Sequence, residues 1–162
     1  MSESLLYSDL VLIGIGEHHL GKTPMSSIGL GSCVGLIIHD REKGIGVLAH
    51  VMLPQSQGKR ERPGKYADTA VEIMISELIN AGCNPRSLVA KIAGGASMFK
   101  SFSGNLNIGE RNVEAIRILL KEHNIPIIGE DVGGNMGRTI VYYPAEKGKV
   151  TVRKGNNIVI EI

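Results

Sequence analysis

The chain has 162 residues, of which 43% are hydrophobic and 21% charged, a balance typical of one globular domain with its own core. Its 18 basic and 16 acidic side chains leave a formal charge of +2, which favours neither nucleic acid nor a membrane surface as partner. No apolar run reaches the roughly 18 residues of a spanning helix, and the first ten residues carry acids where a signal peptide is basic. We therefore expect a single cytoplasmic domain over residues 1–162.

Apolar, β-branched runs predict the first strands, which are Val11–Ile15, Val34–Ile38 and Ile45–Val51. The polar segment Asp40–Gly44 between the last two runs predicts a hairpin turn. An antiparallel hairpin that leaves from Cys33 and returns to His50 places the thiol and the imidazole at the same open end.

Apolar residues at helical spacing predict two helices in the middle of the chain. One begins at Ala67 and is ended by Gly82, and the other runs from about Glu110 to His123. Strands first, helices in the middle and strands last do not alternate as βαβ units do, so we expect a mixed or antiparallel sheet with the helices on one side. The remaining strands are expected at Leu88–Ala93, Ile125–Val132, Thr139–Tyr143, Val150–Arg153 and Ile158–Ile162, the last three as a meander.

A candidate nucleophile, Cys33, follows a run of small and flexible residues that leaves its surroundings open to a substrate and to backbone N–H groups. A thiol needs a base to remove its proton, and His50 is the candidate. A third group must orient the imidazole; Ser27 can do so, and spacing also leaves Asp40 and Asp131 open. The alternative is that the cysteine and the histidine are ordinary core residues.

Other chemistry has weaker support in the sequence. Cys83 follows a glycine at a predicted helix end and is interpreted as a packing residue. No HxH, HExxH or CxxC spacing occurs, so neither a metal site nor a cofactor is expected. The glycine pairs Gly94–Gly95 and Gly133–Gly134 match no phosphate-binding motif and predict tight turns.

Six motifs in order extend over nearly the whole chain, and together they resemble the CheD family of chemoreceptor glutamine deamidases. The motifs are GLGSCVG (Gly29–Gly35), AHVMLP (Ala49–Pro54), KYADTAV (Lys65–Val71), KIAGGASMF (Lys91–Phe99), NIGERN (Asn107–Asn112) and EDVGGNMGR (Glu130–Arg138).

The resemblance implies a layered α/β fold with a mixed β-sandwich and helices packed outside, similar to the cytotoxic necrotizing factor deamidases. It also implies hydrolysis of selected receptor glutamine amides to glutamate and ammonia through a cysteine thioester. By motif position the family's nucleophile falls on Cys33 and its base on His50. Its third catalytic residue, a threonine, falls on Ser27, where the hydroxyl is kept and the methyl is lost.

The surroundings of the thiol carry further expectations. Backbone N–H groups around Gly31, Ser32 and Cys33 are the expected oxyanion hole. The glycine-rich turns, with Gly94, Gly95, Gly134 and Asn135, either border the substrate groove or serve only as tight turns.

The composition favours a protein substrate, because 4% aromatic residues and no tryptophan leave little material for an aromatic ligand pocket. An exposed groove that takes a receptor helix fits this composition better than such a pocket does. The family also binds CheC-type phosphatases, so a regulatory binding module is a second hypothesis, with Met98, Phe99 and Phe102 as candidate contacts. A third hypothesis is a receptor glutamyl methyl esterase, since the same thioester route permits ester hydrolysis. The free protein is expected to be a monomer.

Overall fold

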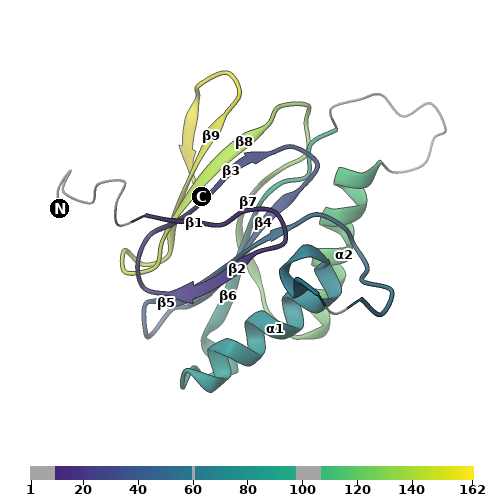
Figure 1. Ribbon diagram of the computed structural model, residues 1–162. Helices are drawn as coiled ribbons and strands as arrows, with labels where there is room; N and C mark the ends of the chain where they lie inside the picture. Colours follow the sequence, from purple (N-terminus) through teal and green to yellow (C-terminus); the bar gives the residue numbers. More distant parts are fainter. Residues whose placement is uncertain (1–9, 60, 98–106) are drawn as a thin grey trace.

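A computed structural model of the chain describes residues 10–59, 61–97 and 107–162 (Figure 1). Most strands lie toward the two ends of the sequence, and the two α-helices lie in the middle with one strand between them. In chain order the elements are β1 (Val11–Leu12), β2 (His18–Gly21), β3 (Met25–Leu30), β4 (Val34–Asp40), β5 (Ile45–Val51), the 3₁₀ turn η2 (Pro63–Lys65), α1 (Ala67–Asn80), the 3₁₀ turn η3 (Pro85–Ser87), β6 (Leu88–Gly94), α2 (Ile108–Glu122), β7 (Ile127–Val132), β8 (Arg138–Tyr143), β9 (Lys149–Lys154) and β10 (Val159–Glu161).

The strands of the described residues form two five-stranded sheets, one ordered β2-β5-β4-β6-β7 and the other β1-β3-β8-β9-β10. In the first, β4 pairs antiparallel with β5 in the register Val34↔Val51 to Asp40↔Ile45, so the predicted hairpin is confirmed. In the second, β8, β9 and β10 follow one another antiparallel, which confirms the predicted meander.

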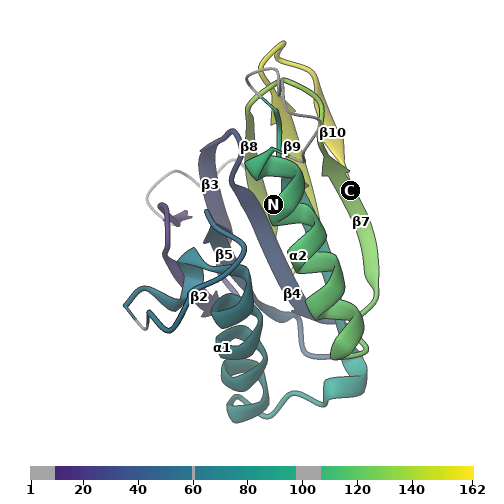
Figure 2. The ribbon, with the colours of Figure 1, turned by 90° about the vertical axis from the view of Figure 1, so that its right-hand side faces the viewer.

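Alternating side chains of β4 and β5 serve two different cores. Leu36 and Ile38 face α1 and α2, which cover one side of the first sheet (Figure 2). Ile37 and Leu48 face the other way and pack against Ile140 and its neighbours in the second sheet. The mixed α/β class and the placement of the helices on one side are thus confirmed, in a sandwich of two sheets with an outer helix layer.

The helix ends follow from local capping chemistry. Asn107 precedes α2 and its side-chain oxygen accepts from the N–H of Glu110 at 3.0 Å, as an N-cap does. Asn124, with φ of 57°, follows α2, and the N–H of Ile125 bonds back to Leu120. Within the described residues, neither helix is long and apolar enough to cross a membrane.

The N-terminal strands differ from the expectation. The strand predicted for Val11–Ile15 ends at Leu12, because the chain turns at residues 15–16 and crosses from one sheet to the other. Strands β2 and β3 were not predicted. Their sequences, HHLG and MSSIGL, lack a continuous apolar run, and β3 contains an irregularity between Ser27 and Leu30.

Candidate active site

The imidazole of His50 lies between the two sheets, where the N-terminal segment crosses from one sheet to the other. His50 is on β5 of the first sheet and Ser27 on β3 of the second, and both side chains are buried. Ser27 Oγ lies 3.2 Å from His50 Nδ1 and 2.6 Å from the carbonyl oxygen of Ile13. The same carbonyl lies 3.4 Å from Nδ1. The three residues therefore form one hydrogen-bonded group that joins the sheets.

The hydrogen bonds at this group select one tautomer of the imidazole. The hydroxyl hydrogen of Ser27 is donated to the Ile13 carbonyl, so the hydroxyl oxygen is left to accept from His50 Nδ1–H. The proton then resides on Nδ1, and Nε2 carries a lone pair. Nε2 is buried and has no hydrogen-bond partner among the described residues. An imidazole in this state is ready to accept a proton at Nε2.

Cys33 shares the inter-sheet face with His50. It immediately precedes β4 and packs against the core between the sheets. His50 pairs directly with Gly35, and Cys33 stands two residues before that glycine, in the diagonal position. Diagonal neighbours of this kind lie roughly 7–8 Å apart, within reach of long side chains. Cys33 is half-buried whereas His50 is buried, so the cysteine is the more exposed member of the pair.

A glycine opposite His50 lets the sheets approach closely at this point. A Cβ atom at Gly35 would lie 2.5 Å from Cδ1 of Ile140 and 3.2 Å from Cδ1 of Leu30, both from the second sheet. The absence of a side chain there keeps β4 close to the strand that carries Ser27.

Burial sets the charge state of both reacting groups. It raises the pKa of the Cys33 thiol above its ordinary value. It also lowers the pKa of His50, against the opposing effects of the Ile13 hydrogen bond and the negative charge of Glu17. Both directions favour a thiol and a neutral imidazole in the free protein near neutral pH, with proton transfer accompanying attack on the substrate.

The backbone around Cys33 has its carbonyl groups turned into the protein. Gly31 O accepts from Ala96 N, and Cys33 O accepts from Gly95 N, both at 2.9 Å. Ser32 O accepts from the side chain of Asn112 at 3.0 Å. The N–H groups of residues 31–33 have no acceptor within the described ranges, which leaves them open to a substrate oxygen.

The two glycine-rich turns support the cysteine loop from behind. A Cβ at Gly94 would lie 2.3 Å from Cys33 O, so the backbone of this turn packs closely against the loop that carries Cys33. Gly133 N bonds to Gly94 O, and buried Arg138 donates to both the Gly94 and the Gly133 carbonyls. Gly134 O accepts from Ser97 N. Asn135 is exposed in the same turn.

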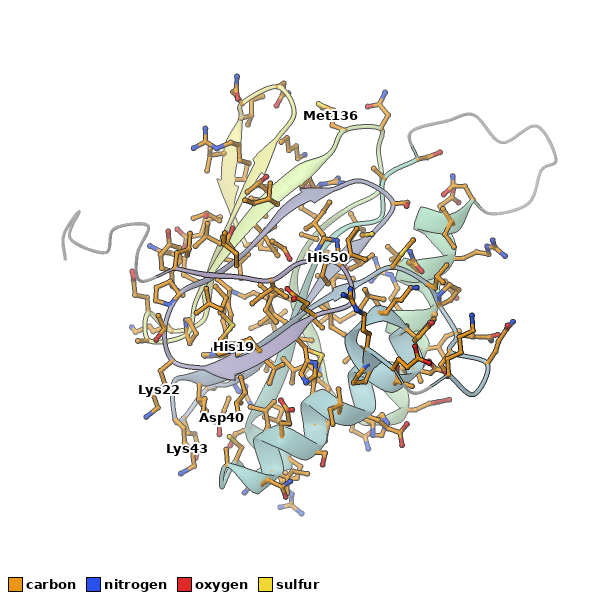
Figure 3. The ribbon with its side chains drawn as sticks, viewed as in Figure 1. His19, Lys22, Asp40, Lys43, His50 and Met136 are labelled. Carbon is orange, nitrogen blue, oxygen red and sulfur yellow. The ribbon has the colours of Figure 1, made fainter. Side chains whose placement is uncertain are left out.

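Two carboxylates left open by spacing lie elsewhere. Asp40 is at the far end of β4, opposite Ile45, and Figure 3 shows it well away from His50. Asp131 is paired with Arg138 at 2.9 Å and Lys154 at 3.2 Å. Of the three candidates to orient the imidazole, Ser27 is the one in contact with it.

The second cysteine, Cys83, belongs to the helix-side core. It is buried there, and burial together with Asp40 raises its pKa to about 12. The candidate contacts Met98, Phe99 and Phe102 lie outside the described residues. Among those described, no three His, Cys, Asp or Glu side chains are grouped so that they could hold a metal ion.

Three groups at the site were missed by sequence reasoning. The Ile13 carbonyl carries no sequence signal. Asn112 falls on the apolar stripe of α2, four residues before Ile116. A polar residue on such a stripe is the sequence feature that could have indicated a buried, hydrogen-bonded role. Arg138 follows a glycine-rich turn and reads as a solvated charge, although its side chain is only 4% exposed.

Comparisons with known proteins identify the family of the chain. The family model of CheD chemotactic sensory transduction proteins matches residues 52–154. The chain is 50% identical over 145 residues to the chemoreceptor glutamine deamidase CheD of Thermotoga maritima, covering 88% of this chain and 90% of that protein. It is 47% identical over 160 residues to a protein of Oceanobacillus iheyensis described as a probable chemoreceptor glutamine deamidase CheD, covering 94% and 96%. A protein of Archaeoglobus fulgidus with the same description is 46% identical over 145 residues, covering 88% and 92%. The chain therefore belongs to the CheD family.

Proposed function

We propose that this protein is a chemoreceptor glutamine deamidase, in which Cys33 is the nucleophile, His50 the general base and Ser27 the residue that orients the base. The names of its relatives support the activity. The observation that carries the assignment of residues is the hydrogen-bonded group of Ser27, His50 and Ile13, which leaves Nε2 unpartnered on the face that Cys33 shares.

Acylation follows from these positions. His50 Nε2 takes the proton of the Cys33 thiol as the sulfur attacks the carbonyl carbon of a glutamine side-chain amide. The C=O electron pair moves onto oxygen, and the N–H groups of Ser32 and Cys33 bind the resulting oxyanion. The oxyanion then collapses, the C–N bond breaks, and Nε2 returns the proton to the leaving nitrogen. Ammonia departs and a thioester remains.

Deacylation reverses the roles with water as the nucleophile. His50 Nε2 removes a proton from water, which attacks the thioester carbon. The C–S bond breaks, Cys33 recovers its proton, and the side chain leaves as glutamate. Throughout, the Ser27 oxygen accepts from Nδ1–H and stabilises the imidazolium that forms in each half-reaction.

The proposal extends to the fold relationship, the location and the partners of the protein. The sandwich with helices on one outer face supports a relationship to the cytotoxic necrotizing factor-type deamidases. We place the protein in the cytoplasm, as one domain and as a monomer when free. Its partners are the cytoplasmic helices of chemoreceptors and a CheC-type phosphatase, with the glycine-rich turns at Gly94–Gly95 and Gly134–Asn135 bordering the substrate groove.

Mass spectrometry of a chemoreceptor cytoplasmic fragment from the same genome tests the function. The unmodified protein is expected to convert specific receptor glutamines to glutamate, and the Cys33→Ala and His50→Ala variants are expected to leave them unchanged. A fragment with glutamine codons replaced by glutamate is the matched control. A receptor that binds but keeps every glutamine would overturn the proposal in favour of a binding module. Conversion confined to methylated glutamate would indicate an esterase.

A further inference from the structure

A buried asparagine connects the nucleophile's backbone with the segment that directly follows the strand of the base. Asn112 of α2 is fully buried, and its side-chain nitrogen donates to Ser32 O at 3.0 Å and to Met52 O at 2.9 Å. Ser32 immediately precedes Cys33, and Met52 follows His50 by two residues. One amide group from the helix layer therefore fixes the chain beside both reacting side chains.

The bond to Ser32 also fixes the direction of the next N–H group. In a trans peptide the C=O and the N–H point in opposite directions. The Ser32 carbonyl points to α2, where Asn112 lies, so the Cys33 N–H of the same peptide unit points away from the helix layer. That direction leads to the inter-sheet face, where the Cys33 side chain packs and His50 lies. Within the described ranges this N–H has no acceptor.

The side chain of Asn112 is not arranged for stability alone. Both of its donor contacts go to backbone carbonyls at the site, while its Oδ1 is buried without a hydrogen-bond partner among the described residues. A buried acceptor without a partner costs free energy, and native structures keep few of them.

We propose that Asn112 is a positioning residue that aims the Cys33 N–H at the oxyanion formed on the substrate amide. This inference rests on the proposed function. The oxyanion exists only along the acylation and deacylation paths. Loss of the Asn112 side chain is therefore expected to affect turnover much more than substrate binding.

Two reactions of the same thiol separate this role from a merely structural one. Deamidation of the receptor fragment passes through an oxyanion, whereas alkylation of Cys33 by iodoacetamide does not. In Asn112→Ala we expect kcat to fall roughly 10- to 100-fold, with KM and the alkylation rate of Cys33 each within about twofold of the unmodified protein. The Tyr142→Phe variant is the control, because it removes a buried hydrogen bond to His39 at the other end of β4. Its kcat is expected to be unchanged.

Each of the other possible results overturns the proposed role of Asn112. If alkylation and kcat change together in Asn112→Ala, the residue holds the loop as a whole and the proposed aim of the N–H is wrong. Full kcat in Asn112→Ala also overturns it. If Asn112→Ala does not fold, Asn112→Leu, which has nearly the same shape and no donor, is measured in its place and the same split is required. An unmodified protein that deamidates no receptor glutamine overturns the proposed function, and the role of Asn112 with it.

Discussion

The hydroxyl oxygen of Ser27 lies 3.2 Å from Nδ1 of His50, and its own hydrogen is directed to the Ile13 carbonyl 2.6 Å away. The serine therefore acts as an acceptor toward the imidazole, which keeps the proton on Nδ1 and the lone pair on Nε2. A hydroxyl in this position does what a carboxylate does in a Ser-His-Asp triad, but without a full negative charge.

Replacement of the Ser27 hydroxyl tests this role. The matched pair is Ser27→Thr, which keeps the hydroxyl, and Ser27→Val, which has nearly the same shape without it. We expect the threonine variant to retain the kcat/KM of the unmodified protein. The kcat/KM of the valine variant should be roughly 10- to 100-fold lower, because a poorly oriented imidazole loses part of the rate enhancement that a general base supplies. Receptor deamidation rates measure both. Equal rates for the two variants would assign the orientation of His50 to Ile13 alone.

The pH dependence of Cys33 reveals whether the resting pair is neutral. Burial raises the thiol pKa above its ordinary value of 9.0, so the alkylation rate by iodoacetamide should still be rising at pH 9. Burial also lowers the His50 pKa below 6.5, so the acid limb of kcat/KM should lie below pH 6.5, where the base becomes protonated. The Cys33→Ala variant gives the background reaction of Cys83. A plateau of alkylation between pH 5 and 8 would instead indicate a thiolate–imidazolium pair.

The fold could be predicted from the sequence wherever one periodicity dominates. The hairpin of β4 and β5 is apolar along its length because both faces are buried, and its register brings His50 opposite Gly35. The helices have clear apolar stripes. In contrast, β2 and β3 were missed, because two histidines, two serines and glycines interrupt them.

The site was only partly predictable for a related reason. Cys33 and His50 are joined by a local hairpin, which sequence spacing can anticipate. The contact of Ser27 with His50 crosses between two sheets, and it depends on the packing of β3, a strand that the sequence did not predict. Asn112 and Arg138 support the site through backbone carbonyls. The position of Asn112 on an apolar stripe marks it as unusual, but no residue pattern identifies the carbonyls that these side chains bind.

Addition of a methyl group at Gly94 is expected to damage the cysteine loop. Gly94 has a φ of 117°, and a Cβ there would lie 2.3 Å from Cys33 O. Gly133 is the matched control: its φ of 82° is also positive, but no heavy atom of the described residues lies within 4 Å of its added Cβ. Gly133→Ala should cost only the backbone strain of about 1–2 kcal/mol. Gly94→Ala should cost more and should also abolish deamidation. Urea unfolding and receptor assays compare the two; equal losses of stability would show that the loop adjusts freely.

The last prediction concerns the buried arginine behind the site. Arg138 bonds to Asp131 at 2.9 Å and to the carbonyls of Gly94 and Gly133, with its side chain 4% exposed. A lysine can replace its charge but not this planar set of donors. The Gly94 carbonyl keeps its bond from Gly133 N, but the Gly133 carbonyl loses the donor that Arg138 supplies, which costs free energy. Arg138→Lys should therefore lower the free energy of unfolding by about 1–3 kcal/mol.

The control for Arg138 is an arginine with an equally good ion pair at the surface. Arg117 bonds to both carboxylate oxygens of Glu130 at 2.7 and 2.9 Å, yet its side chain is 38% exposed. Water solvates both partners when this pair is broken, so Arg117→Lys should cost less than about 1 kcal/mol. Urea titrations of both variants give the comparison. Losses of similar size would mean that the ion pair with Asp131, and not the capture of the two glycine carbonyls, determines what Arg138 contributes.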